Sequence, residues 1–82
     1  MTEDQWTPEE PRDNEVAVSW KQSDDGVYVE VAVVKEGDHF VVTSLAEHRS
    51  SGPSTTRSEP FDTVEEATKE AAKMRSYWDS RL

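Results

Sequence analysis

The stretch Gly26–Lys35, GVYVEVAVVK, decides the fold of this chain. It is rich in β-branched residues, which favour a strand, and successive side chains of a strand point to opposite faces. One face of this strand is wholly apolar: Val27, Val29, Val31 and Val33. The other face is only partly apolar: Tyr28, Glu30, Ala32 and Val34. We therefore predict that the stretch is the central strand of a small sheet.

A second strand is predicted just before it, over residues 15–21, where apolar residues recur at every second position. Its larger apolar side chains share one face: Val16, Val18 and Trp20. The Asp25-Gly26 pair that follows favours a two-residue hairpin turn, because both residue types tolerate a positive φ. A turn at these two residues pairs Trp20 with Val31, which places the indole in the core.

Another turn follows the central strand, and two positions for it fit the sequence. A loop at residues 37–38 pairs Val33 with Val42, whereas a loop at residues 36–37 pairs Val33 with Phe40. Both alternatives leave Phe40 and Val42 on the core face, so the face assignment does not depend on the choice.

A third strand is predicted over residues 39–45, with its end left open as far as residue 49. Residues 50–54, SSGPS, break the pattern, and residues 55–58 are kept open as a short polar edge strand. Without that fourth strand, the connection to the next element is long for so small a domain.

The last predicted element is a helix from about Thr63 to Trp78. Thr63 and Glu66 have the spacing of a capping box, and Phe61 stands just before it as a hydrophobic staple. One apolar stripe follows the helical period: Val64, Ala67, Ala71, Met74 and Trp78. The predicted fold class is α+β, a three- or four-stranded antiparallel β-meander with one C-terminal helix packed on one face. Its predicted core is Trp20, Val29, Val31, Val33, Val42, Ala71, Met74 and Trp78.

Charge and composition narrow the possible partners. The 82 residues include eighteen acidic and nine basic side chains, which gives a net charge of −9. That charge repels nucleic-acid phosphates and anionic lipids, so we expect neither as a direct partner. The absence of cysteine and of a signal-peptide pattern favours a cytoplasmic location. Such an excess of acids would also suit a halophilic source, since carboxylates keep a protein hydrated in a salt-rich cytosol.

The first fourteen residues differ from the rest of the chain. They contain five acidic residues, two prolines and one large apolar side chain, Trp6, and we expect residues 1–14 to form a disordered acidic arm whose deletion hardly changes stability. Residues 15–82 are expected to form a single α+β domain. Trp6 itself has two interpretations: an indole that folds back onto the sheet, or a short docking motif for a basic partner.

The residues that usually carry chemistry are sparse. His39 and His48 are nine residues apart, so on one strand they point to opposite faces and cannot share a metal ion. The sequence spells neither a nucleophile elbow nor a glycine-rich phosphate loop. We therefore expect no catalytic residue, no cofactor and no metal site, and we do not expect an enzyme.

A non-catalytic protein-binding or regulatory module is the function that remains, acting on an unknown protein partner or on a second copy of itself. The face turned away from the predicted helix carries the candidate partner surface: Tyr28, Ala32, Val34, Val41 and Leu45. The alternative is a nucleic-acid mimic that inhibits a DNA- or RNA-binding protein. A mimic needs an unbroken acidic face, whereas the predicted helix mixes basic residues among its acids.

Overall fold

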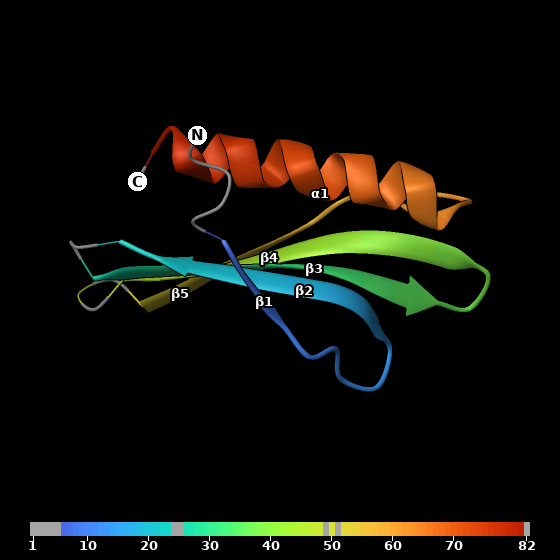
Figure 1. Cartoon of the computed structure of the whole chain (residues 1–82), viewed down its shortest axis with the longest axis horizontal. Coiled ribbons are helices and arrows are strands. Elements are labelled where there is room, and N and C mark those ends of the chain that lie inside the picture. Colours follow the sequence, from blue (N-terminus) through green and yellow to red (C-terminus); the bar gives the residue numbers. More distant parts are fainter. Residues whose placement is uncertain (1–5, 24–25, 49, 51, 82) are drawn as a thin grey trace.

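The computed structural model of this chain describes residues 6–23, 26–48, 50 and 52–81. They form five strands and one helix: β1 (Thr7–Glu9), β2 (Glu15–Gln22), β3 (Val27–Glu36), β4 (His39–His48), β5 (Gly52–Arg57) and α1 (Val64–Asp79). The strands make one antiparallel sheet in the order β1-β2-β3-β4-β5, and α1 lies across one of its faces (Figure 1). The predicted α+β class with an antiparallel sheet and a C-terminal helix is confirmed, with five strands rather than three or four.

Strand β3 is central, as its valines predict, and it pairs with both β2 and β4. Val29, Val31 and Val33 face α1 and are at most 2% exposed. Between β3 and β4, Val33 pairs with Val42, so the loop at residues 37–38 is the correct alternative. Gly37 has a φ of +62°, as the first position of a type II′ turn requires.

The end of the chain returns to the sheet through a short bridge before the helix. β5, the strand left open by the sequence, is present and exposed along its whole length. Phe61 then exchanges backbone hydrogen bonds with Phe40 at 2.7 and 2.8 Å, which leads the chain across to α1. Thr63 caps the helix, because its Oγ1 accepts a hydrogen bond from the Glu66 N–H at 3.2 Å.

The predicted register between β2 and β3 is wrong by one residue. Trp20 pairs with Glu30 instead of Val31, so it lies on the face turned away from α1. The reason is the loop: Gly26 N donates to Ser23 O and has a φ of +89°, which fits a longer loop closed by a glycine rather than a two-residue turn. A bulge between Glu15 and Ala17 then shifts the register again.

The N-terminal segment also differs from the prediction. The composition of residues 1–14 predicts a disordered arm, but Thr7–Glu9 forms β1 and pairs with β2. Trp6 is 8% exposed and belongs to the hydrophobic core, which supports the fold-back interpretation of this residue. Residues 1–5 lie outside the described part of the chain.

Trp6 takes the place in the core that the sequence assigned to Trp20. The register turns Ala17 and Ser19 of β2 toward α1, and these small side chains leave room for the indole of Trp6. The buried core under the helix comprises Trp6, Val29, Val31, Val33, Val42, Ala46, Ala67 and Ala71, with Met74 and Trp78 packed against it and partly buried. Seven of the eight predicted core residues therefore contribute to the core, and Trp20 does not.

A polar cluster fixes Trp6 against the end of α1. Trp6 Nε1 donates to Asp79 Oδ1 at 3.0 Å, and Lys21 Nζ lies 2.5 Å from the same oxygen. Lys21 also lies over the Trp6 ring, 6.0 Å from its centroid. The lysine compensates for an acid at a helix C-terminus, where the helix dipole disfavours negative charge.

Candidate protein-binding surface

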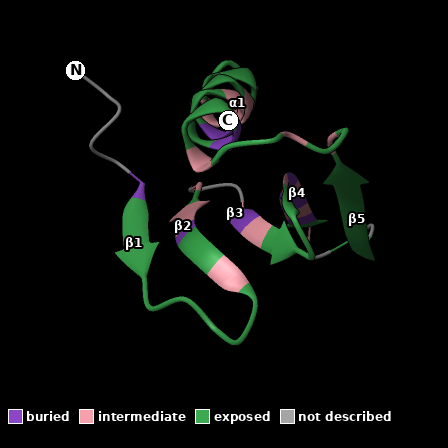
Figure 2. Ribbon diagram, turned by 90° about the vertical axis from the view of Figure 1, so that its right-hand side faces the viewer, coloured by how far each residue is buried: buried purple, intermediate pink, exposed green. Residues whose placement is uncertain are grey.

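The sheet face turned away from α1, here called the open face, has no helix or strand packed on it among the described residues (Figure 2). The strand registers place seven apolar or aromatic side chains on it: Val18, Trp20, Tyr28, Ala32, Val34, Val41 and Leu45. Five of them are the residues predicted as a partner surface. The one-residue shift of β2 adds Val18 and Trp20 to this face. No signal in the sequence distinguishes the observed register of β2 from the predicted one.

The five predicted surface residues are not equally accessible. Ala32 is 5% exposed and Val41 is 1% exposed, so these two side chains offer almost no surface to a partner. Tyr28, Val34 and Leu45 are half-buried and remain accessible in part. The accessible apolar area of the open face is therefore smaller than the sequence pattern suggests.

Two aromatic rings stack at one end of the open face. The ring centroids of Trp20 and Tyr28 are 5.9 Å apart, with an angle of 29° between the ring planes. Both side chains are half-buried. Stacked aromatics present a large and rigid contact area at low entropic cost, which is why such residues are enriched in protein interfaces.

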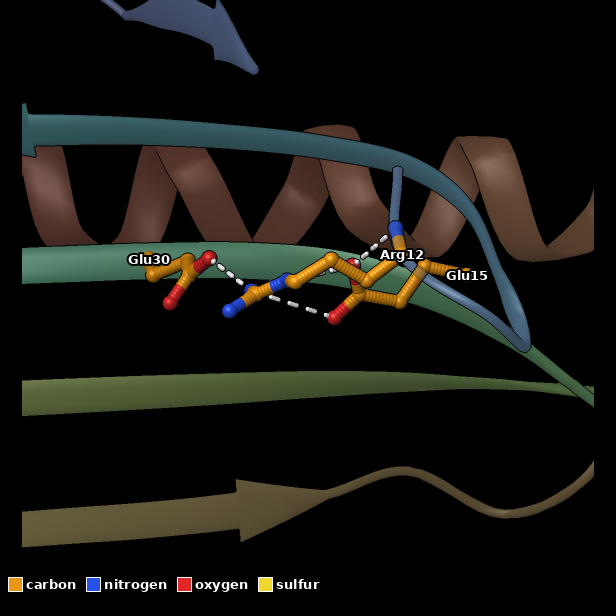
Figure 3. A network of polar contacts seen from close by, with 3 residues as sticks. All are labelled: Arg12, Glu15 and Glu30. Atoms are coloured by element: carbon orange, nitrogen blue, oxygen red, sulfur yellow. Dashed lines mark hydrogen bonds and ion pairs between the residues drawn. The ribbon is translucent and has the colours of Figure 1, made fainter. Parts of the chain in front are cut away.

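An arginine from the loop after β1 covers the middle of the open face (Figure 3). Arg12 Nη2 lies 2.8 Å from Glu30 Oε2, and Arg12 Nε lies 3.1 Å from Glu15 Oε1. The hydrogen bond and charge of Glu15, followed by the charge of Glu30, raise the pKa of Arg12 above its ordinary value. The open face thus already holds one guanidinium between two carboxylates.

A second ion pair explains why Val41 is buried without a covering layer. Arg57 of β5 pairs with Glu36 of β3, and the Nη1–Oε2 distance is 2.7 Å. Because β4 lies between these two strands, the side chains of the ion pair must cross β4 to meet. On the open face of β4, Val41 lies between the position opposite Glu36 and the position opposite Arg57, so the pair passes over Val41. The hydrogen bond from Arg57 lowers the pKa of Glu36 below its ordinary value.

The surroundings of Tyr28 are electronegative. Partial burial is the largest cause of its raised pKa, followed by the charges of Glu30 and Glu9. A hollow of about 460 Å³ lies further along the open face, with Ala32 and Leu45 in its lining. The same lining includes Glu30 and Arg57, so apolar and charged groups meet there.

The other residues singled out by the sequence are distributed elsewhere. Trp6, the candidate docking motif, is buried under α1 and does not reach the open face. His39 and His48 lie on opposite faces of β4, as predicted. His39 Nδ1 is 3.6 Å from Asp62 Oδ1, and His48 Nδ1 is 2.8 Å from Ser50 Oγ. Within the described residues, no three side chains of the metal-ligating types cluster together.

Comparisons with protein-family models, with curated proteins and with solved structures give no match to this chain. In the described part of the chain, α1 is the single helix and is neither long enough nor apolar enough to span a membrane.

Proposed function

We propose that this chain is a non-catalytic protein-binding module and that its open face is the contact surface. The observation that carries the proposal is the stacked pair Trp20 and Tyr28, which shares with half-buried Val34 and Leu45 a sheet face that α1 leaves uncovered. Aromatic and aliphatic side chains gathered at one surface are the usual centre of a protein interface.

A basic protein surface is the partner that complements this face best. The net charge of −9 attracts basic surfaces over long range, and Glu9, Glu30 and Glu47 lie near enough to Tyr28 to raise its pKa. Arg12 between Glu15 and Glu30 supports this choice, because the face holds an arginine of the chain itself. An arginine of the partner could form ion pairs with the same two carboxylates.

Site-specific photo-crosslinking tests this proposal. A benzophenone amino acid replaces Leu45 on the open face and, as the matched control, Glu66 on the exposed side of α1, in the presence of an extract of the source cell. We expect a discrete cross-linked partner from position 45 and none from position 66. Equal products from both positions, or none from position 45, would overturn the proposal.

The identity of the cross-linked product separates the remaining alternatives. A dimer of the chain would identify the partner as a second copy. A nucleic-acid-binding protein released steeply by added KCl would favour the mimic instead, since counterion release makes such contacts strongly salt-dependent. A basic protein that added KCl does not release, because the apolar side chains of the open face hold it, would support the proposal as stated.

A further inference from the structure

The two edges of the sheet differ in what they offer to another strand. Lys35 N donates to Asn14 O, so the odd-numbered residues of β3 direct their backbone groups toward β2. The same alternation continues through β2 to β1, so the backbone groups of Thr7 and Glu9 form hydrogen bonds with β2. The backbone groups of Pro8 point outward, away from the sheet. Proline has no N–H to donate, so the β1 edge is closed to strand pairing.

The β5 edge carries unpaired backbone groups. Ser58 N donates to Val42 O at 2.8 Å, which identifies this pair as hydrogen-bonded and sets the alternation along β5. Ser54 and Thr56 therefore bond to β4, whereas Thr55 and Arg57 direct both their N–H and C=O groups outward. Among the described strands, β5 is the last in the sheet, so no strand satisfies those groups.

An apolar groove runs beside this edge. It has a volume of about 410 Å³, and its apolar lining comes from α1: Met74, Tyr77 and Trp78. Ser54 and Thr56, the β5 residues that face α1, form its other side. Tyr77 is 50% exposed, one of two large hydrophobic residues in the described chain with so much free surface. An added strand would direct every second side chain into this groove, because its side chains alternate in step with those of β5.

We propose that the outer edge of β5 binds an extended peptide segment of another protein by strand addition, with alternate apolar side chains in the groove under α1 and basic residues at its flanks. Outward amides two residues apart at Thr55 and Arg57 match the repeat of an extended polypeptide. The net charge of −9 favours the basic flanks. The groove lies on the α1 side of the sheet, opposite the open face, and binding there goes beyond the function proposed above.

A second copy of the chain fits this edge less well than a different peptide. An antiparallel copy centred on Thr55 would set Pro53 opposite Arg57, and Pro53 has no N–H for the Arg57 carbonyl. Two chains of charge −9 also repel each other.

The test begins with random displayed peptides, about ten residues long, selected on the full chain. We expect the recovered sequences to alternate apolar residues between basic ends. A synthetic copy of one such peptide should lose about tenfold or more in affinity for Thr55→Pro, which removes an outward N–H, and for Tyr77→Ser, which removes a groove wall. Val16→Ser is the matched control, because Val16 is the other exposed hydrophobic residue, at 40%, and lies in β2.

Backbone hydrogen exchange gives a readout that does not depend on variants. In the free chain, the amides of Thr55 and Arg57 should exchange quickly and those of Ser54 and Thr56 slowly; the peptide should protect the first two. The proposal is overturned by recovery of no binding sequence, by equal affinity for all variants, or by unchanged exchange at Thr55 and Arg57. Protection of these amides with rising protein concentration alone would instead assign the edge to a second copy. Trp20→Ser, on the open face in β2 and separated from β5 by β3 and β4, should leave peptide affinity unchanged, which separates this test from the open face.

Discussion

The two faces of the sheet are closed to water by different means. Under α1, the valines of β3 are buried by direct apolar packing against Ala67 and Ala71. On the open face, Val41 is as deeply buried as those valines, although charged side chains rather than a second layer lie across it. Apolar packing provides most of the free energy of folding, whereas exposed ion pairs contribute about 0 to 1 kcal/mol each. The covered face should therefore determine stability, and the ion pairs of the open face should contribute little to it.

The largest expected effect is on the covered face. Val31→Asp places a carboxylate in the core without a partner and should cost several kcal/mol, enough to unfold so small a domain. Leu45→Asp on the half-buried open face is the control and should cost about 1 kcal/mol. Thermal and urea unfolding measure both. A melting temperature for Val31→Asp within a few degrees of the wild type would contradict the assignment of faces.

The two tryptophans give the next largest difference. Trp6→Ala removes a buried indole from the core and should cost about 3 kcal/mol or more, whereas Trp20→Ala removes a half-buried one from the open face and should cost less. Urea unfolding curves of the two variants provide the comparison. For the same reason, deletion of residues 1–14 should be strongly destabilising, contrary to what their composition alone predicts. An equal loss in both variants would remove the distinction between these two side chains.

The sequence was sufficient for the core faces of β3 and β4 and for α1. The valines of the two strands define which face is buried whichever loop around Gly37 is chosen, and the Thr63 cap with its apolar stripe defines α1. It was insufficient for β2, because its alternation is compatible with either face and the loop around Gly26 is longer than the Asp-Gly signal implies.

The N-terminal segment and the two proposed binding surfaces depend on contacts between distant residues. Local composition predicts disorder for a segment with one large apolar group, yet that group, Trp6, bonds to Asp79 at the far end of the chain. Arg12 reaches Glu30 across 18 residues, and the groove beside β5 needs both that strand and α1 in place. No short-range pattern contains this information, so the candidate surface was predicted only in part.

A smaller effect is expected from the cluster at the end of α1. Asp79→Asn keeps the shape of the side chain but removes the charge that Lys21 pairs with, and should cost about 1 to 2 kcal/mol. Glu59→Gln, at an exposed carboxylate for which the structure records no ion pair with a described residue, is the matched control and should change stability little. Equal unfolding free energies for the two variants would show that the cluster contributes nothing measurable.

The smallest effect concerns the ion pair over Val41. Because Arg57 lowers the pKa of Glu36, the pair stabilises the fold above about pH 4.3, where the unfolded glutamate is ionised, and this contribution is lost as the pH falls through the lower folded pKa. An NMR titration of the Glu36 carboxyl carbon should show a midpoint below the ordinary value. Arg57→Gln should bring the midpoint back up, and an unchanged midpoint in that variant would exclude the pair in solution.

The most direct test of the two-face account is a NOESY spectrum of the wild-type chain. The account predicts cross-peaks between the rings of Trp20 and Tyr28, and cross-peaks from the Trp6 indole to core side chains under α1. Cross-peaks from the Trp20 indole to the methyl group of Ala71, with none from Trp6 to the core, would contradict it.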